Sequence, residues 1–213
     1  MIVRHILMIL ASLLLASQAL AQAEPDQKSL FGGYVNSAVY HGYLEQIFNL
    51  REPAILKAEC PVMKVVEQNR TIVLEQPKFV RVDGNFRIDT GSWVALAVLD
   101  RCGSQVTRRA LLKAIPGANQ LQPVFLLPGD FHGNLKLEAD AVRIVTPAMM
   151  AFAKCRDGSK FQVINVTAIT PASANGWSET WTAIACDTKV DAEVTYRATG
   201  EGMNISAGKW KVY

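Results

Sequence analysis

The stretch W-S-E-T-W-T-A-I-A-C, Trp177 to Cys186, carries the pattern that decides the fold. A second tryptophan stands the same nine positions before a second cysteine in W-V-A-L-A-V-L-D-R-C, Trp93 to Cys102. Both stretches read as strands, because aromatic, β-branched and small apolar residues dominate them. Trp177 and Trp181 are four residues apart and share one face of a strand, so we expect them to anchor a core.

The two stretches lie at equivalent places in two similar halves of the chain. A shift of 84 positions superposes them without a gap and keeps the apolar alternation that follows in phase. Matched positions are Trp177 on Trp93, Cys186 on Cys102, and Val190 on Val106. Upstream, P-A-I-L-K-A-E-C at Pro53 corresponds to P-A-M-M-A-F-A-K-C at Pro147. These parallels predict an internal repeat in an α+β fold. We expect two similar antiparallel β-rich modules, each with a short helix and one disulfide, and an additional N-terminal helix.

The chain contains four cysteines, and their number and spacing favour disulfides. They are Cys60, Cys102, Cys155 and Cys186. No C-x-x-C motif or cysteine–histidine cluster is present, so a thioredoxin-type site and a structural zinc site are both disfavoured. Of three possible pairings we favour Cys60–Cys102 and Cys155–Cys186, because each then stays within one module. Each bridge would stabilise the fold by about 3–4 kcal/mol.

The N-terminus reads as a signal peptide. One positive charge at Arg4 precedes an apolar run and the small residues Ala19, Ala21 and Ala23. This order is typical of secretory leaders, and the run is too short for a membrane span of about 20 residues. We therefore assign residues 1–23 to a signal peptide, 24–124 to the N-terminal helix and first module, and 125–213 to the second module. A bacterial periplasmic or secreted location without integral membrane association follows.

Composition narrows the class of protein further. Half of the residues are hydrophobic, which is typical of a globular chain rather than a disordered one. The net charge is +3, and the basic residues are scattered without a stripe of interleaved aromatics. Nucleic-acid binding is therefore not expected.

The periodicity predicts helices and strands along both halves. Apolar steps of three and four residues predict a helix over 29–48, and Pro53 begins a second that ends at Cys60. Strands are expected at 71–75, 78–82, 86–89, 93–99 and 106–114, and later at 161–167, 177–186, 190–198 and 203–213. The alternation L-K-L-E-A-D-A predicts a further strand at 135–141. Thr146 as N-cap and Pro147 at the first turn predict a helix leading to Cys155.

Candidate catalytic residues are few. The loop L-L-P-G-D-F-H-G-N places Asp130 beside His132, and Glu138 follows soon after. These three side chains could serve a periplasmic hydrolase, which is our alternative function. One aspartate and one histidine are too few for a closed metal site, so no metal is expected. No G-x-S-x-G or phosphate-loop motif occurs, and we expect no cofactor.

The sequence favours a non-enzymatic binding protein over an enzyme. A W-x-E-x-W strand ahead of a cysteine, as at Trp177 to Cys186, resembles small secreted domains of unknown function in proteobacteria, a resemblance that implies no activity. We expect an envelope protein or glycan as the partner. Phe131 in the loop and Trp210 and Tyr213 on the C-terminal strand are the predicted contact residues, because aromatic side chains dominate binding surfaces.

Overall fold

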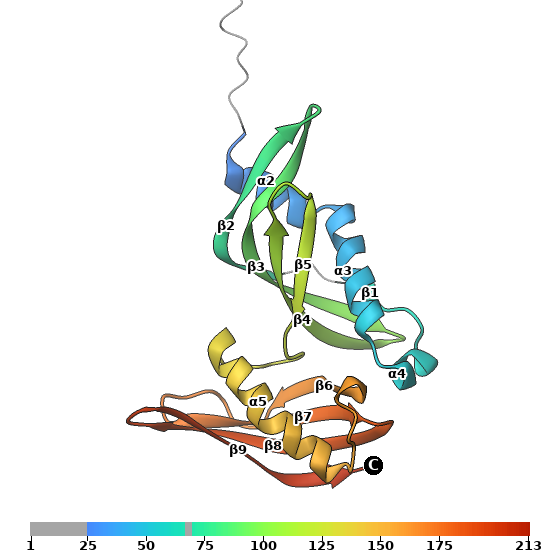
Figure 1. Cartoon of the computed structure of the whole chain (residues 1–213), viewed down its shortest axis with the longest axis vertical. Helices are drawn as coiled ribbons and strands as arrows, with labels where there is room; N and C mark the ends of the chain where they lie inside the picture. Colours follow the sequence, from blue (N-terminus) through green and yellow to red (C-terminus); the bar gives the residue numbers. More distant parts are fainter. Residues whose placement is uncertain (1–24, 67–69) are drawn as a thin grey trace, which may run out of the picture.

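The computed structural model describes residues 25–66 and 70–213, so the signal peptide predicted at residues 1–23 lies outside the described residues. The chain forms two halves that lie end to end (Figure 1). We call residues 25–125 the first half and residues 126–213 the second half. Each half contains one antiparallel sheet and one disulfide, which confirms the α+β prediction.

The first half contains three helices and five strands. These elements are α2 (Gln27–Val35), α3 (Ala38–Arg51), α4 (Ala54–Glu59), β1 (Lys64–Val65), β2 (Arg70–Val82), β3 (Asn85–Arg101), β4 (Ser104–Ile115) and β5 (Gln120–Phe125). The sheet has the order β1-β3-β4-β5, and β2 pairs with β3 next to β1. Neighbouring strands are all antiparallel.

The second half contains one long helix, a short 3₁₀ helix and four strands. These elements are α5 (Leu135–Phe152), η1 (Gly158–Lys160), β6 (Phe161–Ala168), β7 (Gly176–Ala185), β8 (Thr188–Thr199) and β9 (Gly202–Val212). The strands form a simple meander in the order β6-β7-β8-β9, and α5 packs against one face of it (Figure 1).

The helix predicted over 29–48 is in fact two helices. The chain breaks between α2 and α3, where the Ser37 hydroxyl accepts a hydrogen bond from the Tyr40 N–H at 3.2 Å. Serine at this position competes for the backbone and starts a new helix. The break turns the chain, so that α2 covers β2 while α3 continues along the sheet (Figure 1).

The predicted strands of the first half merge into longer ones. Segments 71–75 and 78–82 are one bulged strand, β2, and segments 86–89 and 93–99 are both part of β3. Gly91 makes this continuity possible, because it adopts φ 117° and a Cβ there would collide with the backbone of Pro77. No strand is predicted at 120–125, yet β5 forms there. Its Pro123 cannot donate a hydrogen bond, and the strand lies at a sheet edge, where proline is tolerated.

The prediction for residues 135–141 is wrong. This segment is the first part of α5, and Thr146 and Pro147 lie inside that helix instead of at its start. The Asn134 side chain caps the helix by accepting from the Leu137 N–H at 2.9 Å. Leu137, Ala141, Val145 and Met149, each four residues apart, face the sheet. This spacing is that of a helix with one buried face, although residues 135–141 also alternate between apolar and charged. The helix still leads to Cys155, as expected.

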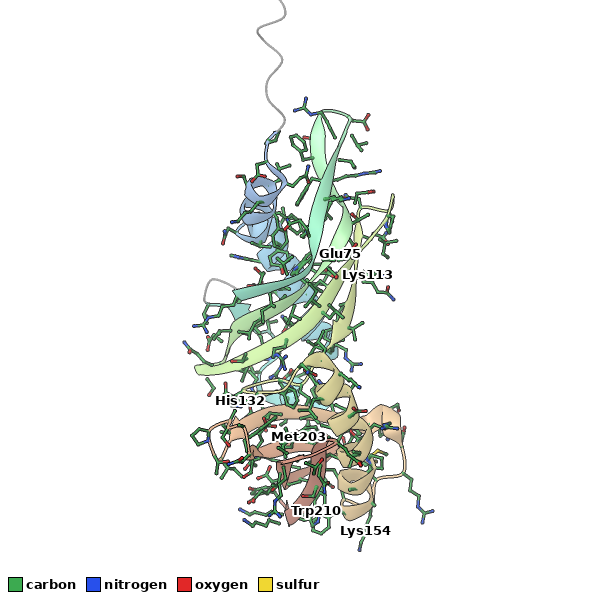
Figure 2. The ribbon with its side chains drawn as sticks, turned by 90° about the vertical axis from the view of Figure 1, so that its left-hand side faces the viewer. Glu75, Lys113, His132, Lys154, Met203 and Trp210 are labelled. Carbon is green, nitrogen blue, oxygen red and sulfur yellow. A yellow bond between two sulfur atoms is a disulfide. The ribbon has the colours of Figure 1, made fainter. Side chains whose placement is uncertain are left out.

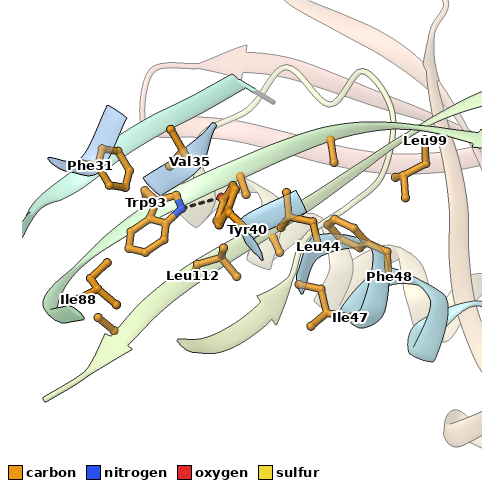
Figure 3. Close-up of a cluster of buried hydrophobic side chains, with 14 of the residues drawn as sticks. Phe31, Val35, Tyr40, Leu44, Ile47, Phe48, Ile88, Trp93, Leu99 and Leu112 are labelled. Carbon is orange, nitrogen blue, oxygen red and sulfur yellow. Dashed lines mark hydrogen bonds between the residues drawn. The ribbon is translucent and has the colours of Figure 1, made fainter. Parts of the chain in front are cut away.

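Each half has its own hydrophobic core. In the first, Tyr40, Leu44 and Phe48 of α3 pack over the inner face of β3 and β4, and Tyr40 lies beside Trp93 (Figure 3). The Trp93 indole N–H donates to the Tyr40 hydroxyl at 2.9 Å, so a buried indole is paired without solvent. In the second core, α5 covers Trp177 and Trp181, which are both buried. The prediction that the tryptophans anchor cores is confirmed.

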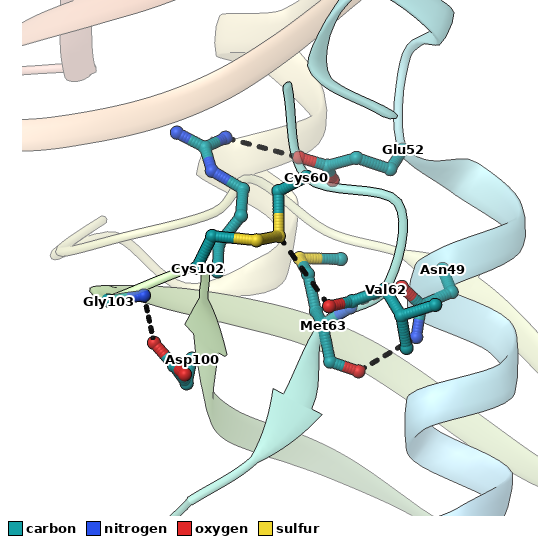
Figure 4. The surroundings of a disulfide bond; sticks show 9 residues. Asn49, Glu52, Cys60, Val62, Met63, Asp100, Cys102 and Gly103 are labelled. Atoms are coloured by element: carbon teal, nitrogen blue, oxygen red, sulfur yellow. Dashed lines mark hydrogen bonds and ion pairs between the residues drawn. A yellow bond between two sulfur atoms is a disulfide. The ribbon is translucent and has the colours of Figure 1, made fainter. Parts of the chain in front are cut away.

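Disulfides join the end of a helical segment to a hairpin turn in both halves. Cys60 after α4 bonds Cys102 in the β3–β4 turn (Figure 4), and Cys155 after α5 bonds Cys186 in the β7–β8 turn. The predicted pairing is therefore confirmed. Cys102 and Cys186 both have φ 49°. The register also repeats at the same offset of 84, because Trp93 pairs with Leu112 as Trp177 pairs with Tyr196.

Candidate functional site

A groove of about 880 Å³ lies in the first half. It lies between α2 and α3 on one side and strands β2, β3 and β5 on the other. Its walls are mainly aromatic and aliphatic, and they include Leu30, Tyr34, Tyr43, Phe79, Phe86 and Leu121. A volume of this size with few polar groups is typical of ligand-binding sites.

The groove exists because the β2–β3 hairpin projects beyond the rest of the sheet. Strand β3 begins at Asn85, but its pairing with β4 begins only at Ser92. Residues of the α2–α3 bend, of this projecting hairpin and of the start of β5 together line the groove. The helix break at Ser37, which the sequence did not predict, is thus part of what shapes the groove.

Side-chain hydrogen bonds hold the walls in place. Gln27 of α2 accepts from the Phe79 N–H at 2.6 Å and donates to the Phe79 carbonyl at 3.4 Å, which fixes the helix to β2. The Tyr43 hydroxyl of α3 donates to the Leu121 carbonyl at 3.3 Å, which fixes the other wall to β5. The groove is therefore held open by bonds between elements rather than by loops.

The groove is almost uncharged. Burial, with a smaller contribution from Tyr43, raises the pKa of Tyr34 to about 12, and burial also raises the pKa of Tyr43. Both phenols are therefore neutral at ordinary pH, and since the Tyr43 proton is donated to the Leu121 carbonyl, Tyr34 is the phenol that can donate to a bound group. Arg87 is the only charged residue among the described residues that line the groove. This lining suits an apolar or aromatic group with a few hydrogen-bonding atoms, and it offers no acid–base pair for catalysis.

Asp130, Phe131, His132 and Glu138 come together at the junction of the two halves. Glu138 of α5 is buried and its carboxylate lies 3.2 Å from the guanidinium of Arg109 on β4. It also accepts a hydrogen bond from the Leu127 N–H. Burial raises the pKa of Glu138, against the lowering effect of Arg109. The contacts of Glu138 are those of a residue that joins the halves.

Glu179 is the centre of this cluster, and the sequence analysis did not single it out. It is fully buried, and its carboxylate accepts from the indole N–H groups of Trp177 at 2.8 Å and Trp181 at 3.1 Å. The backbone N–H of His132 donates to the Glu179 carboxylate at 3.3 Å, and the imidazole Nδ1 of His132 lies 3.7 Å from the same oxygen. The W-x-E-x-W spacing is the signal that could have found it, because alternate residues of a strand share a face.

A shallow crevice of about 350 Å³ opens beside this cluster. Arg109, Asp130, Phe131 and His132 line it, and the His132 side chain is 36% exposed. No serine, threonine or cysteine side chain is among its described lining residues, so a hydroxyl or thiol nucleophile is absent from that lining. His132 next to a buried carboxylate could still act as a general base on water.

The predicted contact residues are not brought together. Phe131 is only 8% exposed and packs against Tyr196 at 6.1 Å, so its ring belongs to the core. Trp210 lies at the opposite end of the second half from His132 (Figure 2) and stacks on Phe152 of α5 at 5.3 Å. Tyr213 is exposed, and its hydroxyl donates to Asp191 at 2.6 Å.

A second buried arginine also contacts the other half. Arg108 of β4 donates to both carboxylate oxygens of Glu52 at 3.1 Å, and to the Ile164 carbonyl of β6 at 3.1 Å. Arg101 adds a further contact to Glu52 at 3.2 Å (Figure 4). Arg108 and Arg109 are consecutive on β4, so their side chains point to opposite faces of the strand. Arg108 contacts Ile164 from one face, and Arg109 contacts Glu138 from the other.

Within residues 25–66 and 70–213, no cluster of three or more histidine, cysteine, aspartate or glutamate residues could hold a metal ion. The helices in the same ranges are all too short or too polar to cross a membrane. Comparison of the chain with protein-family models, curated proteins and solved structures gives no match.

Proposed function

We propose that the chain is an exported, disulfide-stabilised, non-enzymatic binding protein of a bacterial envelope. The groove beside α2 and α3 is the observation that carries this proposal. It is large, mainly apolar and held open by hydrogen bonds, and it lacks an acid–base pair. The partner is an envelope protein or glycan that places an apolar or aromatic group in the groove. Two disulfides and the leader-like N-terminus support residence outside the cytoplasm.

Two adjacent glycines of α2 offer a sharp test. Gly33 lines the groove and Gly32 does not, and a Cβ at either position would meet nothing within 4 Å. Gly33→Phe should therefore fill the groove without disturbing the fold, whereas Gly32→Phe is its matched control. Neither change removes a side-chain contact.

The readout is the fluorescence of an apolar naphthalene dye, followed by capture of envelope components on immobilised protein. We expect Gly33→Phe to abolish both signals and Gly32→Phe to keep them, with equal melting temperatures. Dye binding and capture that are equal in the two variants would contradict the siting of the function in the groove.

The C-terminal strand is a second proposed contact surface. Tyr213 is exposed, and the ammonium groups of Lys189 and Lys211 lie over its ring at 4.9 and 4.3 Å. Trp210 is partly buried against Phe152. Tyr213→Ala should weaken capture without changing stability if this strand contributes, whereas unchanged capture would remove it from the contact surface.

The alternative is a hydrolase in which His132 activates water. The observation that favours it is the buried Glu179 carboxylate beside His132, since such a carboxylate can orient an imidazole. A panel of ester, peptide and glycan substrates distinguishes the two functions. Activity that is lost in His132→Ala at an unchanged melting temperature would replace the binding proposal with this one.

A further inference from the structure

Three of the four sheet edges of the described chain carry features that prevent pairing with another strand. The outer strand β9 carries Lys209 and Lys211, and charged edge positions discourage association. Strand β5 contains Pro123, which has no N–H. The β6 edge is covered, because the carbonyls of Ile164 and Val166 already accept from Arg108 and from the Asp130 N–H.

In β2, Pro77 and Lys78 occupy the later part of the strand, whereas residues 70–74 contain neither a proline nor a lysine. Residues 70–74 pair with β3 on one side only, and no described segment pairs with the other. The three consecutive residues Ile72, Val73 and Leu74 are 60%, 42% and 50% exposed. Ile72 shares the outer face with its partner Val94, whereas Val73 shares the opposite face with Trp93. This edge is therefore apolar on both faces, which is typical of a strand that another strand covers.

We propose that residues 70–75 pair antiparallel with the same segment of a second copy of this chain, around a two-fold axis through Ile72. The proposal goes beyond the binding function and does not depend on it. In this register Ile72 lies opposite its own copy, and Thr71 lies opposite Val73. Directly opposed residues then share a face, as antiparallel pairing requires.

The two charges that flank the apolar residues fit this arrangement. Arg70 pairs with Leu96 and Glu75 with Ser92, so both lie on the outer face together with Ile72. The register shift between Val73 and Glu75 shows that Leu74 is an extra residue of a β-bulge. Glu75 is therefore the second paired residue after Ile72, just as Arg70 is the second before it. Arg70 of one copy therefore faces Glu75 of the other, twice in the dimer.

Both charges are available for such contacts. Arg70 and Glu75 are exposed, and neither takes part in an ion pair among the described residues. Glu75 stands on the open surface of the first half in Figure 2. A parallel arrangement would oppose like charges instead, which is unfavourable. The charges thus select the antiparallel self-pairing.

Charge reversal tests the proposal with the full mature chain. Arg70→Glu alone places four carboxylates around the axis, and Glu75→Arg alone places four guanidinium groups there. Each single variant should weaken the dimer by roughly tenfold or more, because two cross-strand pairs change from attraction to repulsion. An equimolar mixture of the two should form a heterodimer, and the double variant R70E/E75R should form the homodimer again. Sedimentation and native mass spectrometry measure the species.

The matched control reverses a charge at another edge. Lys211→Glu on β9 should leave the mass of the wild-type dimer unchanged, and circular dichroism should show all variants folded. A wild-type chain that stays monomeric overturns the proposal, even if it captures a foreign peptide at β2. A dimer that survives the single reversals, or that neither the mixture nor the double variant restores, also overturns it.

Discussion

At the scale of single residues, Glu179 has the most demanding surroundings in the molecule. Its buried carboxylate satisfies three N–H groups, from Trp177, Trp181 and His132. Glu179→Leu leaves these donors without a partner, and each unsatisfied buried group costs about 1–3 kcal/mol. We expect the free energy of unfolding to fall by about 3–5 kcal/mol in urea titrations, if the donors regain part of their hydration.

Glu179→Gln is the matched control for that change. The amide keeps one acceptor oxygen but turns its NH₂ group toward a donor, so we expect a loss between those of the wild type and Glu179→Leu. Equal stability of all three proteins would contradict the structural role of the carboxylate.

The buried tyrosines predict a stability that depends on alkaline pH. The pKa of Tyr34 is raised to about 12, and burial raises the pKa of Tyr40 and Tyr196 as well. Because the pKa of the folded state lies above the unfolded value of 10, the folded protein holds the phenol proton more tightly than the unfolded chain does. The resulting contribution to the free energy of unfolding is complete below pH 10 and is lost as the pH rises through the folded-state pKa. Unfolding free energies should therefore decline above pH 10. Tyr34→Phe should decline less steeply, and a slope as steep as that of the wild type would show that other groups cause the loss.

Residue types alone could locate part of this cluster but not its roles. Asp130 and His132 attract attention because they lie in a loop, and Glu138 because it follows them. Glu179 is a neighbour of His132 only in the folded chain, 47 residues further on. Phe131 looks like a surface anchor in sequence, but the junction of the halves buries it. A local sequence pattern does not show which side chains are buried by segments that are distant in the sequence.

At the scale of elements, the two disulfides have equivalent positions and should contribute equally. They close loops of 42 and 31 residues, and the entropy that a crosslink removes from the unfolded chain varies only with the logarithm of this length. We expect Cys60→Ala/Cys102→Ala and Cys155→Ala/Cys186→Ala each to lower the free energy of unfolding by about 4 kcal/mol. Urea titrations of both double variants measure this, and losses that differ by several fold would contradict the equivalence of the halves.

The elements show where periodicity is reliable. Strands 177–186 and 190–198 were predictable because one face of their sheet is buried and the other is wet, so alternation reports burial directly. The segment 135–141 alternates too, yet it is helical, since Asn134 caps it and the apolar residues 137, 141, 145 and 149 face the sheet. A seven-residue window is too short to separate these periods.

The groove could not be predicted from element patterns. It depends on where the β2–β3 hairpin separates from β4 and on the bend between α2 and α3. Both are set by long-range packing. Tyr34, Tyr43 and Phe79 therefore read only as core residues in the sequence.

At the scale of the whole molecule, the Arg109–Glu138 ion pair and the hydrogen bond from Arg108 to the Ile164 carbonyl join the halves, and Arg108 is the link that can be removed most cleanly. Arg108→Met leaves the Glu52 carboxylate buried and short of a partner, and it removes the bond to the Ile164 carbonyl of the second half. Such a loss costs about 3–5 kcal/mol. We expect thermal unfolding to change from one transition to two, as the halves uncouple.

An exposed ion pair provides the control for that prediction. Arg143→Met removes a surface contact to Asp140 and should change stability by about 0–1 kcal/mol. A single cooperative transition in Arg108→Met, at nearly the wild-type temperature, would show that other contacts couple the halves.

The two tryptophan–cysteine spacings predict an internal repeat at an offset of 84. The strand register has the same offset, because Trp93 pairs with Leu112 and Trp177 pairs with Tyr196. We propose a common origin by duplication, with residues 24–124 and 125–213 as the two units. The halves differ where function is proposed, since the groove is present only in the first among the described residues.

The most direct test of the proposed function uses two exposed positions on one helix. Val39 lines the groove and Leu50 does not, although both belong to α3 and are 79% and 71% exposed. A photo-reactive benzoylphenylalanine at each position, in protein produced in its source cell, would record what lies beside it. We predict a covalent adduct with an envelope component at position 39, none at position 50, and loss of the adduct when Gly33→Phe fills the groove. No adduct at 39, or equal adducts at both positions, would contradict the account.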